Sequence, residues 1–222
     1  HLTYSPPQPL TILLYRQNFE LLGINLPKEK QKRLAGLRKN LNQASTRFSK
    51  NILAATKAGT VQVANASQVE GIPTAILVTA KQRAKKAKKA GWIFSMQSPE
   101  YDRVIRLARD RSFRRTFFLR SNSLASDLGS KKLDNSPIIH TLVHGRKELA
   151  HILGAPSFAA WTISRKMAKT PEAVERLLRR ISRAALPAAE KDWQEMQTFG
   201  LTLGLPTIEA WAVSYVTDLC RQ

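Results

Sequence analysis

Residues 134–154 read DNSPIIHTLVHGRKELAHILG, and this stretch indicates the fold class of the chain. It opens with DNSP, whose polar side chains cap the first backbone N–H groups of a helix and whose proline suits the first turn. Apolar residues then follow at the spacing of one helical face, and Gly154 ends the pattern. That face comprises Ile138, Leu142, Leu149 and Leu153, with Ile139, Val143 and Ala150 beside it. The stretch therefore predicts an amphipathic helix.

A second helix is predicted after Pro27, a residue suited to a first turn. Between Lys28 and Lys57 there are nine basic residues and a single acid, Glu29. Apolar residues form one stripe at spacings of three, four and seven, which are Leu34, Leu37, Leu41, Phe48 and Ile52. The pattern is typical of a basic rod with one buried side.

The segments between these two helices predict a small β element and a further helix. Thr60–Val63 and Trp92–Met96 alternate with β-forming residues, which favours two short strands. Gly71-Ile72-Pro73 opens a helix that runs into the lysine-rich stretch 81–89.

The C-terminal third predicts only helices. One runs from Ser157 to Met167, and the next begins at Thr170 and ends at Pro187. A further helix from Pro187 reaches about Phe199, and a final apolar segment covers residues 208–219. The helix after Thr170 is expected to direct four apolar residues inward, which are Val174, Leu177, Leu178 and Ile181.

The predicted organisation is an arm followed by one domain. Pro6, Pro7 and Pro9 disfavour a helix at the start, so residues 1–26 are expected to form an extended arm. Within it, residues 10–22 are apolar and fit either a strand or a buried helix. Residues 27–222 are expected to form an all-α helical domain with at most a two-stranded β element.

Composition restricts the class of protein. The 43% hydrophobic content favours a folded chain, and no apolar run approaches the roughly 20 residues of a membrane span, so a soluble protein is expected. The single Cys220 excludes internal disulfides and fits a reducing compartment. Because the chain begins with His1, we expect a processed product or a fragment.

Charge is the strongest compositional signal. The chain holds 36 basic and 16 acidic residues, for a net charge of +20. Thirteen basic residues and three acids lie between Lys81 and Arg120 alone. Such an imbalance favours contact with nucleic acid, because lysine and arginine neutralise phosphates and release counterions. Phe113, Phe117 and Phe118 interleave with arginines there, but their helical spacing favours the core over base stacking.

His140 and His144 lie one turn apart, as in the zinc-binding His-Glu-x-x-His motif. The residue after the first histidine is Thr141 where that chemistry needs a glutamate, and no third ligand is positioned, since Glu148 lies on the same helix. We therefore interpret both as surface histidines and predict no metal site. The sequence contains neither a Gly-x-Ser-x-Gly nucleophile elbow nor a phosphate-binding glycine loop, and no base is identified for Cys220. We therefore predict neither a catalytic residue nor a cofactor.

The same stretch 134–154 resembles "DNS–IIxxIxxLRxELAxLLG" of the oligopeptidase A and thimet oligopeptidase family of zinc metallopeptidases. Further segments are similar in order, from about Phe19 to Arg221. FSKNILAATK at 48–57 resembles "FSxNVLDATK", KMAKTPE at 166–172 resembles "KMAxSPE", and Trp211 with Tyr215 also matches. The resemblance implies an all-helical region that precedes the family's zinc helix, so no catalytic residue is transferred.

The departures from the family pattern concern charge. The segment equivalent to 81–89 is usually rich in alanine and glutamate, and the family's "DNRELREEMYRAY" corresponds to RDRSFRRTFF at 109–118. Acidic surface positions have become basic while apolar positions are kept. This pattern is expected when a fold is retained and its surface is adapted to a polyanion.

The first hypothesis is a non-catalytic, peptidase-derived module of a ribonucleoprotein, namely an organellar (mitochondrial) ribosome, on the matrix side. It would contact rRNA phosphates and ribosomal proteins as part of a large complex. The alternative is a fragment or split subunit of an active zinc oligopeptidase whose metal site lies elsewhere. A third is a structural subunit of another large mitochondrial complex. The predicted RNA-binding patch comprises Lys28, Lys30, Lys32, Arg33, Arg38, Lys39, Lys81, Arg83, Lys85, Lys86, Lys88, Lys89, Arg109, Arg111, Arg114 and Arg115.

Overall fold

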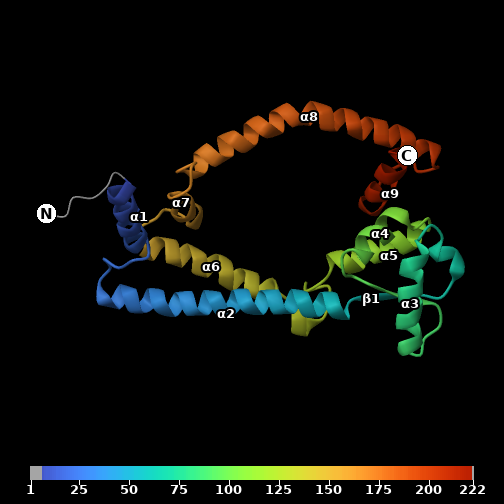
Figure 1. Cartoon of the computed structure of the whole chain (residues 1–222), viewed down its shortest axis with the longest axis horizontal. Helices are drawn as coiled ribbons and strands as arrows, with labels where there is room; N and C mark the ends of the chain where they lie inside the picture. The colour runs from blue at the N-terminus through green and yellow to red at the C-terminus, as the bar shows by residue number, and fades with distance from the viewer. Residues whose placement is uncertain (1–6, 222) are drawn as a thin grey trace. The chain divides into compact units, whose positions relative to one another are not determined.

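A computed structural model describes residues 7–221 of the chain, and Figure 1 shows its elements. The predicted all-α class is confirmed, since helices dominate and the described residues form a single two-stranded sheet. In order, the elements are α1 (Pro7–Leu21), α2 (Lys28–Ala58), β1 (Thr60–Val63), η1 (Ala66–Val69), α3 (Thr74–Lys86), β2 (Trp92–Ser95), α4 (Glu100–Leu107), α5 (Arg111–Asn122), η2 (Lys131–Leu133), α6 (Ser136–Ile152), α7 (Phe158–Ile163), α8 (Pro171–Thr202) and α9 (Ala210–Cys220).

The chain forms two compact units, and each is built from two separate segments. Unit 1 takes the residues up to Phe48 together with Pro137–Ser182, and unit 2 takes Ser49–Ser136 with the residues from Arg183 onward. The predicted domain 27–222 is thus divided between both units, and α2 and α8 each contribute to both.

The core of unit 1 lies between α2 and α6. Leu34 and Leu41 of α2 and Leu149 of α6 are buried there, as the two predicted apolar stripes require, whereas Ile52 of the α2 stripe is 39% exposed. Gly145 allows the close approach of the helices, because a Cβ at this position would lie 2.7 Å from Cδ2 of Leu41. The indole N–H of Trp161 donates to the carbonyl of Leu21 and links α7 to α1.

The core of unit 2 surrounds the predicted β element. The strands β1 and β2 pair antiparallel, with Val63 opposite Trp92, as the alternating segments predicted. Phe94 of β2 packs against Phe113 and Phe117 of α5, with ring centroids 5.2 and 6.3 Å away. Phe113 and Phe117 are buried, so the expected core role of these phenylalanines is confirmed, and Phe118 is half-buried.

Two motif asparagines meet inside unit 2. Asn51 comes from FSKN in α2 and Asn135 from the DNS sequence before α6, and both are buried. The Nδ2 of Asn51 donates to the Oδ1 of Asn135 at 2.9 Å across 84 residues of sequence. A buried amide needs such a partner, so this bond ties the end of α2 to the start of α6.

The extended arm predicted for residues 1–26 is wrong over Pro7–Leu21, which form α1. Pro7 and Pro9 fall in the first turn, where a helix requires no backbone N–H donors, so they are compatible with it. The part of the predicted arm at residues 1–6 lies outside the described residues.

The helix α8 also differs from the prediction, since it continues through Pro187. One proline removes a single backbone hydrogen bond and strains one turn, and the remaining bonds of this 32-residue helix persist around it. The expected inward orientation is wrong as well for three of its four apolar residues, whereas Val174 is half-buried. Leu177, Leu178 and Ile181 are 47%, 60% and 55% exposed.

Candidate nucleic-acid interface

The lysine-rich stretch 81–89 begins on the last turns of α3 and continues around its C-terminal turn. Lys88 has a φ of 54°, and the N–H of Lys89 donates to the carbonyl of Ala84 at 2.9 Å. This is the six-to-one bond of a helix-ending turn, and it folds the chain back along α3. All five lysines are exposed, and none forms an ion pair with a described residue.

This turn creates a hollow of about 530 Å³ beside α3. Its charged lining consists of Lys81, Lys85 and Lys89, whereas Lys86 and Lys88 do not line it. The remaining lining residues are Val78, Gln82, Ala90 and Gly91. Gly91 has a φ of 78°, and a Cβ there would lie 2.0 Å from the carbonyl oxygen of Val63. The position just before β2 therefore requires glycine.

Trp92 follows Gly91 in the chain and lies beside Lys81. The Nζ of Lys81 lies 5.7 Å from the centroid of its ring, within the range of a cation–π contact. The ring is half-buried and packs on the core of unit 2. The first lysine of the stretch is therefore held near the protein surface by an aromatic side chain.

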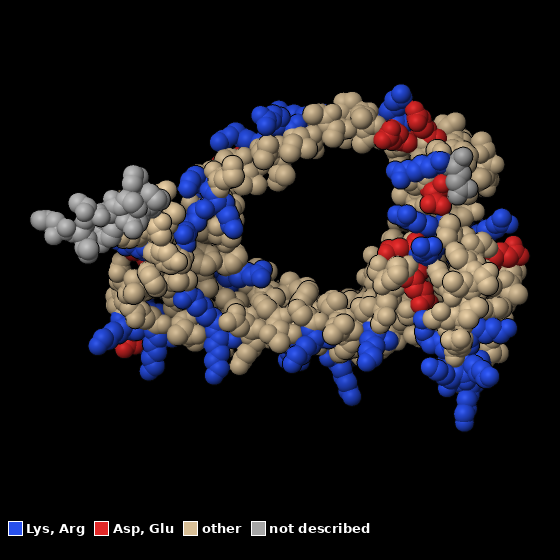
Figure 2. Space-filling view, in the orientation of Figure 1, with Lys and Arg blue, Asp and Glu red and all other residues tan. Residues whose placement is uncertain are grey.

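The basic residues of α2 form a second group, in unit 1. Lys28, Lys30, Lys32 and Lys39 are exposed and unpaired within the described residues, and Arg38 is half-buried. Arg33 is different, since its Nη2 lies 2.7 Å from Oε1 of Glu148 on α6. Figure 2 shows lysine and arginine side chains projecting from α2 and from the end of α3 with few acidic neighbours.

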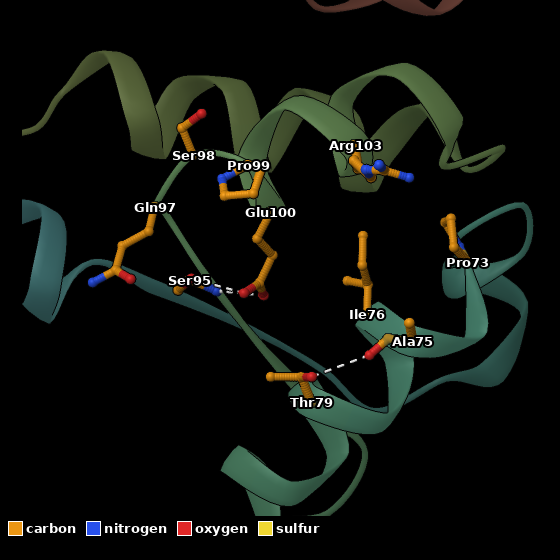
Figure 3. A pocket seen from close by; sticks show the side chains of 10 residues that line it. All are labelled: Pro73, Ala75, Ile76, Thr79, Ser95, Gln97, Ser98, Pro99, Glu100 and Arg103. Atoms are coloured by element: carbon orange, nitrogen blue, oxygen red, sulfur yellow. Dashed lines mark hydrogen bonds between the residues drawn. The ribbon is translucent and has the colours of Figure 1, made fainter.

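Arg83 is engaged in holding the fold of unit 2. Its two Nη atoms donate to the two carboxylate oxygens of Glu100 at 2.9 and 2.8 Å. Each of these oxygens also accepts a hydrogen bond from Ser95, from its N–H and its hydroxyl. Glu100 lies in a pocket of about 430 Å³ and points toward Ser95 (Figure 3). With four bonds to its carboxylate, this acid and Arg83 link α3, β2 and α4.

Arg114, a member of the predicted RNA-binding patch, is buried, with only 2% of its surface exposed. Its Nη1 donates to the carbonyls of Ala108 and Arg109 at 2.6 and 2.9 Å, and its guanidinium carbon lies 3.9 Å from the ring centroid of Tyr215. Burial lowers the pKa of Arg114 from its ordinary value, and the charges of Tyr215 and Asp110 oppose that shift. The apolar spacing around Arg114 was a signal of this burial, since Phe113 and Phe117 on the same helix are core residues.

The other arginines near α5 differ in the partners that they contact. Arg111 pairs with Glu209, and the guanidinium carbon of Arg115 lies 5.4 Å from the ring centroid of Trp211 on α9. Arg109 is exposed and forms no ion pair with the described residues. Only Arg109 and Arg115 of the four predicted residues at 109–115 thus present a guanidinium to solvent without a carboxylate partner.

His140 and His144 lie on an exposed side of α6, with ring centroids 6.3 Å apart. Within residues 7–221 no group of three or more histidine, cysteine, aspartate or glutamate side chains could hold a metal ion. None of the described helices has both the length and the apolar content of a bilayer span. Cys220 is exposed and reduced.

The structure sorts the sixteen predicted residues by their environment, which the sequence could not do. Arg33, Arg83 and Arg111 are ion-paired and Arg114 is buried. Gln82 and Val78 line the hollow with the lysines but were not among the predicted residues, although the four-residue spacing of Lys81 and Lys85 signals a shared face. The exposed, unpaired members are Lys28, Lys30, Lys32, Lys39, Lys81, Lys85, Lys86, Lys88, Lys89, Arg109 and Arg115.

Comparison with known proteins confirms the resemblance drawn from the motifs. The family described as Peptidase family M3 matches residues 104–222. Oligopeptidase A of Salmonella typhimurium is 29% identical over 209 residues, which cover 93% of this chain and 31% of the relative. Organellar oligopeptidase A, chloroplastic/mitochondrial, of Arabidopsis thaliana is 28% identical over 212 residues, which cover 91% of this chain and 26% of the relative. The chain spans about a third or less of the length of these curated relatives.

Proposed function

The chain belongs to peptidase family M3, and from that premise we propose that it acts as a non-catalytic structural component of a ribonucleoprotein. Its exposed lysines neutralise phosphates of RNA, and its helical surfaces contact neighbouring proteins. We propose an organellar ribosome as the host, and the mitochondrial ribosome is the first one to test. The protein recognises the RNA backbone and its shape, not its bases.

One observation carries this proposal, namely the basic residues that have no structural role. Once the ion-paired arginines and the buried Arg114 are set aside, clusters of exposed lysines remain on α2 and at the end of α3. Like charges close together on a helix destabilise it, so nothing in the fold explains their presence. A polyanionic partner does explain them, because phosphates remove the repulsion and release counterions on binding.

The relatives support two parts of the proposal, which are the derivation of the chain from a peptidase and its location in an organelle. The proteins that match are named as peptidases, whereas this chain covers about a third or less of their length. One relative carries the name of an organellar enzyme, chloroplastic or mitochondrial, which favours an organelle. Fractionation of cells with an antibody to this chain tests the location, and recovery only in the cytosol would contradict it.

The test of function is recovery of the native protein from cell extract, with washes at rising salt and a readout of bound RNA and proteins. We expect rRNA and ribosomal proteins to be recovered together. The purified chain is also expected to bind RNA with an affinity that falls steeply as salt rises. An affinity for RNA that is absent at low salt would contradict the proposal.

A second candidate is a subunit that completes an active zinc oligopeptidase, and α8 supports it. In unit 1 the side chains of Leu177, Leu178 and Ile181 share one face of this helix and are about half exposed. Contiguous exposed apolar side chains mark a surface that another protein segment covers. We propose that the partner in this case carries the part of an M3 peptidase that this chain does not match.

This second candidate has its own test in the same extract. Recovery of a zinc-containing partner that hydrolyses peptides, without RNA, would support it. Leu178→Glu is then expected to abolish partner recovery. Arg183→Glu is expected to retain it, because the exposed Arg183 lies at least about 120° around the helix from Leu177, Leu178 and Ile181. Equal recovery by both variants would show that this face is not the contact.

A further inference from the structure

The hollow beside α3 gathers three lysines that are separated along the sequence. Lys81 and Lys85 are one helical turn apart on α3, and the C-terminal turn brings Lys89 to the same hollow. Lys86 and Lys88 belong to the same stretch but do not line it. The structure therefore separates a run of five lysines into three that converge and two that do not.

The chemistry of this hollow fits an anion with apolar and hydroxyl groups beside it. Its lining holds three ammonium groups and no acid, together with the apolar surface of Val78, Ala90 and Gly91. The C-terminal end of α3 carries partial negative charge that offsets part of the repulsion between the lysines. Gln82 adds an amide that both donates and accepts hydrogen bonds.

We propose that this hollow binds consecutive phosphate groups along one strand of RNA, an inference that rests on the RNA-binding function proposed above. A helix rises about 1.5 Å per residue, so lysines four residues apart are separated by about 6 Å along α3. Successive ammonium groups thus meet neighbouring phosphates of one strand. Gln82 faces the sugar, where its amide bonds the 2′-hydroxyl that distinguishes RNA from DNA.

The test compares two double variants that remove equal charge from the same stretch. Lys85→Gln with Lys89→Gln removes two lysines of the hollow, and Lys86→Gln with Lys88→Gln removes the two outside it. Lys81 is kept in both because its ammonium also contacts Trp92. All four lysines are exposed, so thermal melting of the two variants is expected to match the unaltered chain.

Binding is measured by fluorescence anisotropy with a short, labelled, single-stranded RNA of mixed sequence over a series of salt concentrations. The hollow variant is expected to lose roughly tenfold in affinity at low salt, and its plot of log affinity against log salt to become shallower by about 1.4, for two contacts at about 0.7 each. The variant outside the hollow is expected to change the slope by less than half as much.

The outcomes separate this inference from the proposed function. If the unaltered chain binds RNA and both double variants weaken that binding equally, the proposed role of the hollow is refuted while the RNA-binding function stands. If the unaltered chain fails to bind RNA at low salt, both fail. If the hollow variant loses binding to phosphatidylserine vesicles and keeps its affinity for RNA, the site serves a membrane and the proposal is overturned. A matching DNA strand that binds as tightly as RNA would refute the role of Gln82.

Discussion

At the scale of single residues, basic side chains in this protein divide into those that build the fold and those that remain free. Arg111 and Arg114 coincide with arginines in the family segment "DNRELREEMYRAY", and the structure shows one paired with Glu209 and the other buried. Arg109 and Arg115 stand where that segment has an acid, and both are exposed. The basic residues at which this chain departs from the quoted family segment are thus the exposed pair.

Arg114→Met is expected to destabilise the protein by about 1–3 kcal/mol, because the buried carbonyl of Ala108 and the partly buried carbonyl of Arg109 lose a charged donor. Urea denaturation measures this effect. Arg120→Met on the same helix removes an exposed arginine and is expected to change stability by less than about 0.5 kcal/mol. The Arg114 variant should retain its slope of RNA affinity against salt, and a reduced slope would show that Arg114 reaches RNA after all.

Glu172 predicts a pH dependence at the start of α8. Its own backbone N–H and the hydroxyl of Thr170 donate to its carboxylate and lower its pKa below the ordinary value of 4.5. Because the folded-state pKa is the lower one, the ionised carboxylate stabilises the first turn above pH 4.5, and this contribution is lost as the pH falls through the lowered pKa. The protection factors of the amides in this turn, which compare their exchange with that of an unfolded chain at the same pH, are expected to fall on acidification.

Glu172→Gln provides the control for that pH effect. This variant lacks the ionisable group, so its first turn should exchange at a rate that acidification changes less, after correction for the intrinsic pH dependence of exchange. An equal loss of protection in both proteins would assign the effect to other carboxylates.

At the scale of elements, the contact between α2 and α6 depends on one glycine. A Cβ at Gly145 would lie 2.7 Å from Cδ2 and 3.3 Å from Cγ of the buried Leu41. By contrast, a Cβ at Gly36 of α2 would have no atom within 4 Å apart from its chain neighbours and the nearby backbone of its own helix. Two helical glycines of this chain therefore differ only in what surrounds them.

Gly36→Ala is expected to stabilise the protein by about 0.8–1 kcal/mol, which is the gain in helix propensity. Gly145→Ala gains the same propensity but must displace Leu41, at a cost of about 1–3 kcal/mol. We therefore expect Gly145→Ala to be less stable than Gly36→Ala by at least about 1 kcal/mol in urea denaturation. Equal stability of the two variants would mean that the helices separate without cost.

At the scale of the whole molecule, the net charge of +20 acts on stability and on binding in opposite directions. Salt screens repulsion among the lysines and arginines of the folded chain, so it stabilises the folded state. The same screening weakens the attraction to RNA phosphates. Salt concentration therefore distinguishes the effect of the charge on stability from its effect on RNA binding.

We expect the melting temperature of the free protein to rise by about 2–4 °C between low and moderate sodium chloride, which corresponds to about 1 kcal/mol for a chain of this size. Differential scanning fluorimetry measures this shift. The affinity for RNA should fall over the same range of salt. A melting temperature that falls with salt would indicate that ion pairs, not repulsion, dominate the electrostatics of the fold.

Local patterns in the sequence were sufficient to predict most elements. The apolar stripes predicted α2 and α6, and alternation predicted β1 and β2, because each pattern reflects the geometry of its own segment. The core role of Phe113 and Phe117 followed from the same spacing. The family assignment came from short motifs in a conserved order along the chain, which also lies within the sequence itself.

The tertiary structure alone decided which residues of these elements meet. It paired Asn51 with Asn135, buried Arg114 against the ring of Tyr215, and placed Lys89 in the hollow that Lys81 also lines. It also kept α8 continuous through Pro187, where the local preference of proline predicted an end. Periodicity states which side of a segment is apolar, whereas the partner that covers it depends on residues far along the chain. For that reason the charge of +20 was evident from the sequence, and the division of its lysines and arginines into structural and free groups was not.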